Sequence, residues 1–377
     1  MKDTLDLFSA LGDRLKDFGG DAASRQVAER ACRANGWFTP AEVCRAVRTL
    51  SRDMLQRPKL ERWLAAYPAL PAARPLDVLV VMAGNIPLVG FFDLLCVVVA
   101  GHRCLVKPSA KDTVLMEYVV GLLREIDPAV PVSFCDGTAP AEAVIATGGD
   151  NANRCFRARY AGIPALLRGH RQSVAVLSGR ETEAQLAGLA DDIWAYSGLG
   201  CRSVSLIFAP EGYEPALQIP PVNDKYINNY RQQRALLEMQ GRPFVDLGCA
   251  VAVEQCAFPA ALSRIAYAHY ATLDEVAAWL AGHDGELQCV VTGCLPHSRR
   301  VACGVGLTKS VIFGVVTKQY SKNTTAMSMV FRFRMLSDEN DNFVRDYEAM
   351  YDMTLLDFHD FILQSLEYEP CMASFFT

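Results

Sequence analysis

Short apolar segments that alternate with helix-length segments dominate this sequence from Asp77 onward. The segment DVLVVMA, at 77–83, is a Val-rich run typical of a buried strand, and a turn and the long apolar run 88–101 follow it. The same order continues through RCLVKPS, the helix-length segment 111–126, PVSFCDG, EAVIATGG and NANRCFRARY. Because alternating strands and helices form parallel sheets with helices on both faces, the sequence predicts an α/β fold.

The rest of the chain is organised around this alternation. Residues 1–70 carry apolar side chains at helical spacing and a helix start at Thr39 and Pro40, and they predict a helical N-terminal arm. The strand-and-helix order begins again near residue 180. We therefore expect one α/β domain over 71–180 and a second one over 181–307.

Charge and cysteine content exclude several classes of protein. The net charge of −5 leaves no basic surplus for binding to phosphate backbones, so nucleic acid is not an expected partner. The 13 cysteines form no regular framework, as expected for reduced thiols in a cytosolic protein. Because neither C-x-x-C nor H-E-x-x-H occurs, no metal site is predicted.

Hydropathy predicts a cytoplasmic location. The apolar run 88–101 carries Asp93 and is too short to cross a bilayer, which takes about 20 residues. The first 18 residues mix acidic and basic side chains and lack the layout of a signal peptide. We therefore expect no membrane span.

Polar residues and glycines follow the predicted strands, where open parallel sheets bind their ligands. The dinucleotide fingerprint G-x-G-x-x-G is absent, because the nearest pairs, at 198 and 200 and at 304 and 306, lack the third glycine. The candidate ligand-binding residues are Asn85, Lys107, Gly148, Gly149 and His170, and Cys201 follows in SGLGCRS.

Each candidate also has an ordinary structural interpretation. Asn85 precedes Ile-Pro and is a common turn former, and Lys107 is a plausible charge at a strand end. Cys201 is one of 13 thiols, most of which are expected to be buried. Arg168 and Arg171 fit a solvated face. Only a family motif favours the functional interpretation.

Such a motif is present as an ordered set of segments. AGNIPLVGFFDLLCVVVAGHRCLVKPSAKD, VIATGG, LLRGHRQSVAVLSGRET, GLGCRSVS and DKYINNY together resemble the acyl-CoA reductase family, typified by the bacterial luminescence fatty-acid reductases. That family is a branch of the aldehyde dehydrogenase superfamily. The likeness extends to about residue 307. It implies an aldehyde dehydrogenase-like fold, with an NADP-binding domain over 71–180 and a catalytic domain over 181–307.

The resemblance implies roles for the residues of the acyl chemistry. Cys201 is similar to the family's nucleophile, and Asn85 to the asparagine that donates a hydrogen bond to the oxyanion. Hydrolytic aldehyde dehydrogenases carry a glutamate base where Arg168 stands here, and an arginine cannot act as a base. An acyl group on Cys201 is therefore expected to be reduced and not hydrolysed. His170 is assigned to activation of the thiol or to proton transfer as CoA leaves.

The resemblance also implies NADP as cofactor. Lys107, in KPS, is similar to the lysine that holds the adenosine ribose of the cofactor, and Ser109 of the same motif is assigned to the cofactor too. Gly148 and Gly149 are similar to the glycine turn near the pyrophosphate. Glu254, in AVAVE, is assigned to the nicotinamide ribose, although its spacing after Cys201 is shorter than usual.

The expected reaction is NADPH-dependent reduction of a long-chain acyl-CoA or acyl-protein thioester to the aldehyde. The expected assembly is a homo-oligomer or a complex with acyl-transfer proteins. Two alternatives stay open: another oxidoreductase of the superfamily that uses the same thiol, and an inactive binding protein with an altered C-terminal region.

That altered region begins near residue 306, where the likeness ends. Residues 308–328 fit no period and are predicted to be a linker. Residues 329–377 resemble the start of a small plasmid-type ORF-3-like domain, and they predict an unrelated strand-and-helix unit that contributes little to the core of the reductase fold. The expected strand of this unit is VFRFRML. Its expected helix is LLDFHDFILQSL, which begins at a capping box at 354–357. A joined reading frame and a genuine fusion both explain this region.

Overall fold

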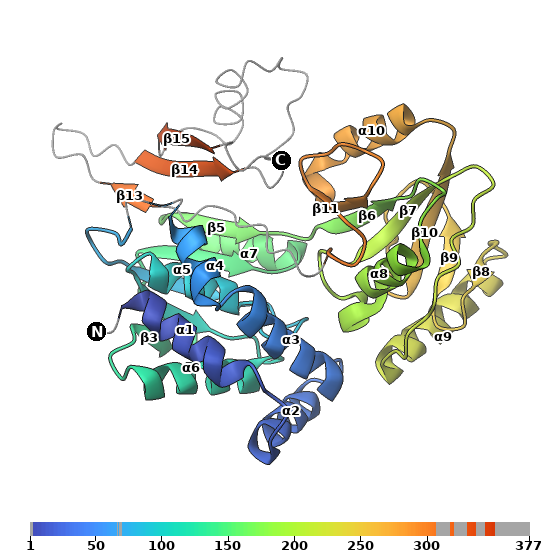
Figure 1. Ribbon diagram of the computed structural model, residues 1–377. Coiled ribbons are helices and arrows are strands. Elements are labelled where there is room, and N and C mark those ends of the chain that lie inside the picture. Colours follow the sequence, from blue (N-terminus) through green and yellow to red (C-terminus); the bar gives the residue numbers. More distant parts are fainter. Residues whose placement is uncertain are drawn as a thin grey trace. The chain divides into compact units, whose positions relative to one another are not determined.

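The computed structural model of the chain describes residues 3–65, 67, 70–306, 317–319, 330–336 and 344–350. The chain divides into two compact units between Gly169 and His170 (Figure 1). The sequence had predicted the boundary ten residues later, near residue 180. We describe each unit by itself.

In the described residues, four helices precede the first strand, in the segment 1–70 where helices were predicted. They are α1 (Thr4–Leu15), α2 (Ala22–Ala34), α3 (Pro40–Asp53) and α4 (Arg57–Leu64). Thr39 is the N-cap of α3, where its hydroxyl accepts a hydrogen bond from the backbone N–H of Glu42 at 3.2 Å. The helices are not a separate arm, because Phe8 packs edge-on against Phe91 of the next helix and shares one apolar core with it.

The first unit contains a five-stranded parallel sheet in the order β3-β2-β1-β4-β5. Its strands are β1 (Asp77–Val81), β2 (Arg103–Lys107), β3 (Val132–Phe134), β4 (Ala143–Thr147) and β5 (Ala165–Arg168). The intervening helices are α5 (Phe91–Val99), α6 (Thr113–Ile126) and α7 (Asp150–Arg159). Strand β5 is the one strand of this sheet that the sequence analysis missed. It lies at the sheet edge with Ala165 and Leu166 exposed, so it lacks the apolar run of a buried strand.

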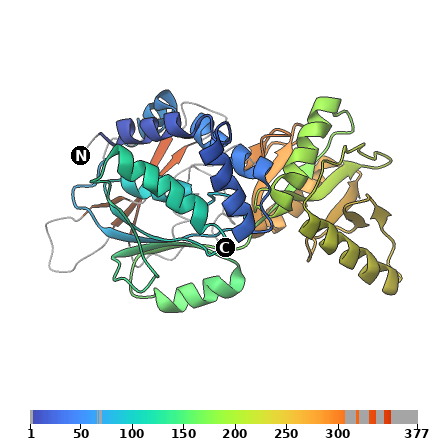
Figure 2. The same cartoon turned by 90° about the horizontal axis from the view of Figure 1, so that it is seen from below.

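Side chains that alternate along β1 build a core on each face of this sheet. Val78 and Val80 belong to the core with α1, α5 and α6, whereas Leu79 and Val81 pack with the aromatic side chains of α7. Figure 2 shows α6 and α7 on opposite faces of the sheet. The predicted α/β architecture is confirmed for this unit.

The second unit contains a seven-stranded sheet in the order β12-β11-β6-β7-β10-β9-β8, parallel except for the pair β8–β9. Its strands are β6 (Gln172–Val176), β7 (Val204–Pro210), β8 (Val245–Asp246), β9 (Val251–Glu254), β10 (Arg264–Tyr270), β11 (Leu287–Thr292) and β12 (Arg300–Val301). Its helices are α8 (Glu183–Trp194), α9 (Asp224–Met239) and α10 (Leu273–Gly282). The expected boundary near residue 180 was wrong because it left β6 in the first domain. Strand β6 pairs with β7 and with the distant β11, and alternation along the chain does not reveal such a pairing.

Three strands beyond the second unit's sheet form an antiparallel sheet in the order β13-β14-β15. They are β13 (Thr317–Gln319), β14 (Val330–Leu336) and β15 (Val344–Met350). Strand β14 is the strand predicted at VFRFRML, whereas β13 lies in the predicted linker and β15 was not expected. The helix predicted from residue 355 lies outside the described residues.

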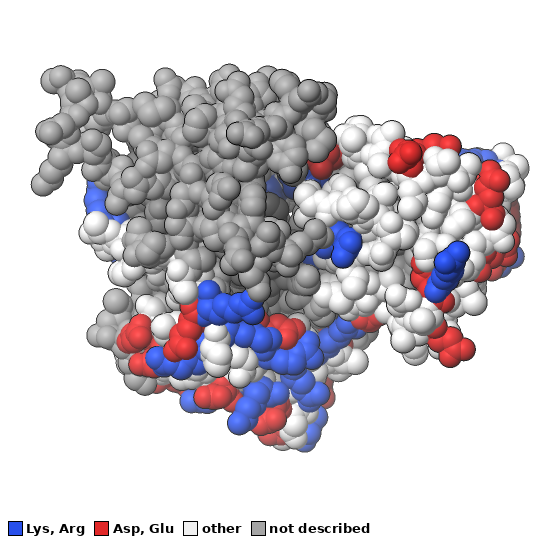
Figure 3. Space-filling model, turned by 45° about the horizontal axis from the view of Figure 1, so that its top comes forward, with Lys and Arg blue, Asp and Glu red and all other residues white. Residues whose placement is uncertain are grey.

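Basic and acidic side chains are interspersed on the face of the molecule drawn in Figure 3. Several of them form exposed ion pairs, such as Arg57 with Asp6 and Arg52 with Asp53. Across the described parts of the chain, no helix is long and apolar enough to cross a membrane.

Candidate active site

The carboxyl edge of the first sheet collects most of the predicted ligand-binding residues. Asn85 follows β1, Lys107 and Ser109 end and follow β2, and Gly148 and Gly149 follow β4. Strand β1 lies between β2 and β4, with Val81 level with both Lys107 and Ala146. Parallel strands therefore bring these residues to one edge, as the sequence predicted.

The loop that carries Asn85 is held by contacts at Gly84. The side-chain amide of Asn35, at the end of α2, donates a hydrogen bond to the Gly84 carbonyl at 3.3 Å. A Cβ atom on Gly84 would lie 2.5 Å from the hydroxyl oxygen of Ser109, so this backbone passes directly beside the residue that follows β2. A glycine is required at this close approach.

A second contact fixes the loop three residues beyond Asn85. Leu88 has a φ of 58°, in the left-handed region that side chains rarely adopt. Its N–H donates a hydrogen bond of 2.7 Å to Oδ2 of Asp112, the N-cap residue of α6. Burial raises the pKa of the Asp112 carboxyl to about 7, although the bond from Leu88 acts to lower it. The backbone of the Asn85 loop is thus positioned by a buried carboxyl group.

Lys107 lies half-buried at the end of β2. Its stem crosses Gly137, where an added Cβ would lie 2.5 Å from the lysine Cδ. Gly137 has a φ of 90°, so a side chain there is disfavoured by the backbone as well. This packing directs the Lys107 side chain along the carboxyl edge.

The two glycines after β4 begin helix α7, with Gly149 as its N-cap residue. The N–H of Gly148 donates to the Arg168 carbonyl at 3.1 Å, and the amide of Asn153 donates to the carbonyls of Gly148 and Arg168 at 2.8 and 2.7 Å. A Cβ on Gly149 would meet no atom within 4 Å, whereas one on Gly148 would lie 2.9 Å from Ala152. Gly148 is therefore a packing glycine, and Gly149 leaves open space at the helix N-terminus. That arrangement fits the pyrophosphate of a dinucleotide.

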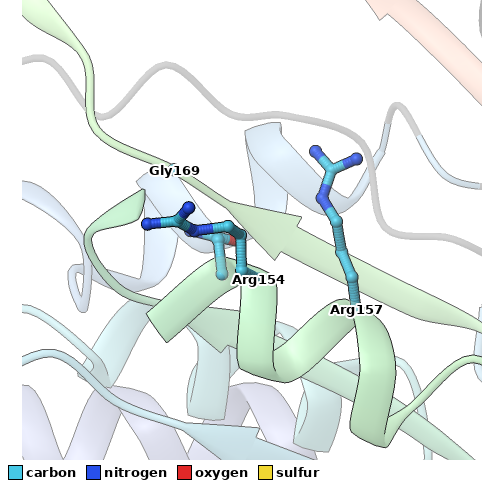
Figure 4. A pocket seen from close by; sticks show the side chains of 4 residues that line it. Arg154, Arg157 and Gly169 are labelled. Atoms are coloured by element: carbon cyan, nitrogen blue, oxygen red, sulfur yellow. The ribbon is translucent and has the colours of Figure 1, made fainter. Parts of the chain in front are cut away.

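A surface cavity of about 340 Å³ lies beside this turn, lined by Asn153, Arg154, Arg157 and Gly169. Figure 4 shows both arginines rising from α7, with Arg154 beside Gly169. The guanidinium of Arg154 donates a hydrogen bond to the neutral side chain of Asn151. Positive charge therefore surrounds the region where α7 begins.

Arg168, at the end of β5, is the counter-ion of a buried aspartate. Its Nη1 donates to both carboxylate oxygens of Asp93, on α5, at 2.6 and 2.7 Å. The Asp93 side chain is 7% exposed, so this pair neutralises a charge inside the first unit. Arg168 therefore has a structural role that the sequence analysis did not anticipate, because its partner lies 75 residues earlier.

In the second unit, Cys201 lies exposed in the turn between α8 and β7. Three successive residues before it, from Tyr196 to Gly198, have positive φ. The hydroxyl of Ser173, on β6, donates a hydrogen bond to the Cys201 carbonyl at 2.9 Å. The thiol thus lies at the amino edge of the second sheet, in a turn fixed to the neighbouring strand.

Exposure separates Cys201 from most of the other cysteines. Cys96 and Cys104 are buried, and burial strongly raises the pKa of both thiols. Among the described cysteines, Cys155 and Cys256 are exposed as well, but neither lies in a turn at a strand start. The interpretation of Cys201 as one more buried thiol was therefore wrong.

The structure does not bring Glu254 to Cys201. Glu254 ends β9 and is exposed, and β9, β10 and β7 run parallel. Glu254 is level with Ile207 of β7, three residues after that strand begins at Val204, so it lies toward the opposite edge of the sheet from Cys201. Mutation of Glu254 tests its assignment to the nicotinamide ribose. His170 is exposed and makes no hydrogen bond or ion pair to the described part of the chain.

Comparison with known proteins identifies the family. The sequence model of the acyl-CoA reductase (LuxC) family matches residues 21–218, more than half of the chain. The chain belongs to this family. The match includes Asn85, Lys107, Gly148 and Cys201 and ends well before residue 307, where the likeness was expected to end.

One curated relative is the long-chain acyl-protein thioester reductase of Aliivibrio fischeri, 25% identical over 169 residues. The aligned segment covers 40% of this chain and 35% of the relative, so the chain spans about a third of that relative's length.

Solved structures share the fold at low sequence identity. A putative aldehyde dehydrogenase from Burkholderia cenocepacia aligns with a TM-score of 0.57 and 15% identity, over 74% of this chain and 72% of that one. An acetylating aldehyde dehydrogenase from Geobacillus thermoglucosidasius aligns with a TM-score of 0.56 and 11% identity, over 80% and 82%. The expected aldehyde dehydrogenase-like fold is confirmed.

Proposed function

We propose that this protein reduces an acyl-CoA or acyl-protein thioester to the aldehyde, with NADPH as reductant and Cys201 as the residue that carries the acyl group. The observation that carries the proposal is the exposure of Cys201 in a turn anchored by Ser173 at a sheet edge. A nucleophilic thiol must reach both solvent and substrate, and the buried Cys96 and Cys104 cannot. Membership of the acyl-CoA reductase family supports an acyl thioester as the substrate.

In the proposed first step, the Cys201 thiolate attacks the thioester carbonyl carbon. A carbon–sulfur bond to Cys201 forms, the bond to the leaving sulfur breaks, and the leaving thiolate takes up a proton. We assign stabilisation of the oxyanion to the Asn85 amide and the Cys201 N–H, as the family resemblance implies, and one such donor is worth about 3 kcal/mol of barrier. We assign the proton of the leaving group to His170, which is exposed just before β6.

NADPH, when bound, supplies the hydride that converts the Cys201 thioester to the aldehyde and restores the thiolate. We assign its adenosine ribose to Lys107 and Ser109, at the end of β2. Gly148 and Gly149 would hold its pyrophosphate at the start of α7, where backbone N–H groups favour negative charge and Gly149 leaves open space.

The ion pair of Arg168 with Asp93 supports reduction over hydrolysis. A hydrolytic enzyme needs a base near the acyl group to activate water, and a guanidinium has no lone pair to act as that base. Without that base, the thioester on Cys201 persists until it is reduced.

The test is incubation of the purified protein with a long-chain acyl-CoA, first alone and then with NADPH. We expect intact-mass spectrometry to show one acyl adduct on the wild type and none on Cys201→Ala. NADPH is then expected to remove the adduct, with loss of the absorbance of the reduced cofactor and one free thiol released per aldehyde. An adduct of equal yield on Cys201→Ala would overturn the assignment. An adduct that NADPH leaves unchanged while water removes it would favour a hydrolytic enzyme.

A further inference from the structure

The amino edge of the second sheet gathers charged side chains around Cys201. Strands β11, β6 and β7 are adjacent and parallel, so their first residues lie at one edge. Asp284 precedes β11, and the side chain of Arg299, which precedes β12, reaches back to it. Arg171 directly precedes β6, and Cys201 precedes β7. Arg171 therefore lies between an ion pair on one side and the thiol on the other.

The ion pair of Arg299 with Asp284 is complete without Arg171. Nη2 of Arg299 donates to Oδ2 of Asp284 at 2.7 Å, and Nη1 donates to the carbonyls of Asp284 and Leu287 at 2.6 and 2.9 Å. The two side chains are only 12% and 10% exposed. The carboxylate of Asp284 is thus already neutralised by a closer cation.

Arg171 is half-buried and makes no hydrogen bond or ion pair to the residues that the structure describes. Burial lowers the pKa of its guanidinium, and the positive charge of Arg299 lowers it further, whereas the negative charges of Asp284 and of the Cys201 thiolate raise it. A partly desolvated cation without a counter-ion is unfavourable, and an anion beside it is stabilised.

Strand pairing ties the start of β6 to the Cys201 turn. Ser173, two residues after Arg171, is opposite Val204, three residues after Cys201. The Ser173 hydroxyl also donates a hydrogen bond to the Cys201 carbonyl at 2.9 Å. Arg171 and Cys201 therefore lie at the same edge of two adjacent strands.

Three other ionisable groups lie near this edge. Arg202 donates from Nε to the neutral Gly306 carbonyl, and its Nη2 is buried without a hydrogen-bond partner in the described residues. Asp192, on α8, accepts the Gly304 N–H at 2.7 Å. The Cys289 thiol, on β11, is buried against the Ser173 hydroxyl, and burial raises its pKa. Arg171 and Arg202 are therefore two cations that no carboxylate of the described residues neutralises, and the charge of Arg171 interacts with the Cys201 thiolate.

We infer that Arg171 is a positioning residue that holds Cys201 in its thiolate form, with the thiol proton released to solvent before the acyl group arrives. Its catalytic meaning rests on the proposed function, but the charge interaction itself does not. A thiolate at neutral pH is the reactive form toward any electrophile. Arg171 thus supplies positive charge at the edge of the sheet where Cys201 lies.

The test measures the rate of alkylation of Cys201 by iodoacetamide as a function of pH, with each cysteine followed by peptide mass spectrometry. Loss of the charge in Arg171→Gln is expected to raise the pH midpoint by about one unit and to slow alkylation about tenfold at pH 7. Arg171→Lys is expected to restore most of the rate. Arg231→Gln, which removes an exposed arginine of α9 in the same unit, is the matched control and should leave the midpoint unchanged.

Exposed Cys155 and Cys256 serve as internal references, and their rates should not change in any variant. Should Arg171→Gln fail to fold, Arg171→Met keeps the apolar stem and removes only the charge. An unchanged midpoint in a folded variant overturns the inference, as does equal slowing at every pH, because a purely structural role would have that effect. Acyl adduct formation, measured separately, distinguishes the two proposals: a shifted midpoint without an adduct refutes the function alone, and an adduct without a shift refutes only the role of Arg171.

Discussion

The two sheets of this protein present their candidate residues at opposite edges. In the first sheet, Asn85, Lys107 and Gly149 follow strands, at the carboxyl edge. In the second sheet, Arg171 and Cys201 precede strands, at the amino edge. Helix N-termini lie at the carboxyl edge of a parallel sheet, so a pyrophosphate finds backbone N–H groups there. At an amino edge, positive charge has to come from side chains.

Arg168 and Arg171 lie three residues apart, in different units, and differ in whether a carboxylate neutralises the guanidinium. Arg168 ends β5 in the first unit, and the buried carboxylate of Asp93 neutralises it. Arg171 precedes β6 in the second unit and has no such partner among the described residues. One guanidinium therefore stabilises the fold, and the other is left to interact with an anion.

The largest effect is expected from breaking the ion pair of Arg168. Arg168→Gln leaves the Asp93 carboxylate buried and unpaired, and it is expected to lower the free energy of unfolding by about 3 kcal/mol. Arg168→Glu adds a second carboxylate and should destabilise the protein further. Urea denaturation of each variant measures these changes.

The matched control is Arg103→Gln, which breaks an exposed pair with Asp77 and should cost less than about 1 kcal/mol. The double variant Asp93→Asn with Arg168→Gln is expected to recover part of the loss, because it removes the unpaired charge. Equal stability of Arg168→Gln and wild type would contradict the structural role. If Arg168→Glu folds, faster release of fatty acid without NADPH would support its proposed correspondence to the hydrolytic base.

Local patterns in the sequence predicted most of the strands and helices. They also predicted that candidate residues lie at the carboxyl edge of the first sheet. Strands such as Asp77–Val81 are Val-rich and buried, so their composition reveals them. The exposed edge strand Ala165–Arg168 has no such run and was missed. The pairing of β6 with β11, which moves the unit boundary to residue 170, joins segments more than 100 residues apart and has no local signal.

The candidate site was predictable where a motif carried it. Lys107 and Cys201 lie at strand ends because their motifs include the strands themselves. The proposed role of Arg171 depends on its position between Cys201 and the distant Arg299. The structural role of Arg168 depends on its ion pair with Asp93. Such relations depend on the folded register. From the sequence alone, Arg168 was matched to the position of the hydrolytic base, with a solvated face as the alternative, and Arg171 was given only a solvated face.

A smaller effect is expected from Asp112, which fixes the Asn85 loop at the carboxyl edge. Burial raises the pKa of its carboxyl to about 7 in the folded protein, against about 4 in an unfolded chain. The folded state therefore binds the proton more tightly, and this contribution to stability is largest at low pH and is lost as the pH rises toward 7. Between pH 5 and pH 7 the loss amounts to about 2 kcal/mol.

Asp112→Asn is expected to abolish this part of the pH dependence, because the amide oxygen still accepts the Leu88 N–H without titrating. Urea denaturation at pH 5 and pH 7 of the wild type and the variant measures the difference. An identical pH slope in both proteins would show that Asp112 does not titrate in this range. The midpoint for Cys201 alkylation should stay unchanged, since Asp112 belongs to the first unit.

The smallest effect is expected at Glu254, which ends β9 at the carboxyl edge of the second sheet, away from Cys201. Glu254 is exposed at the opposite edge of the sheet from Cys201. Glu254→Ala should therefore leave the rate of Cys201 alkylation and the KM for NADPH unchanged within about twofold. Lys107→Ala, at the carboxyl edge of the first sheet, is the contrasting variant and should raise the KM for NADPH about tenfold or more, since it removes a charge-assisted hydrogen bond. A rise in KM for Glu254→Ala as large as that for Lys107→Ala would show that the cofactor reaches the carboxyl edge of the second sheet too, and the assignment of the two functions to opposite edges would then be wrong.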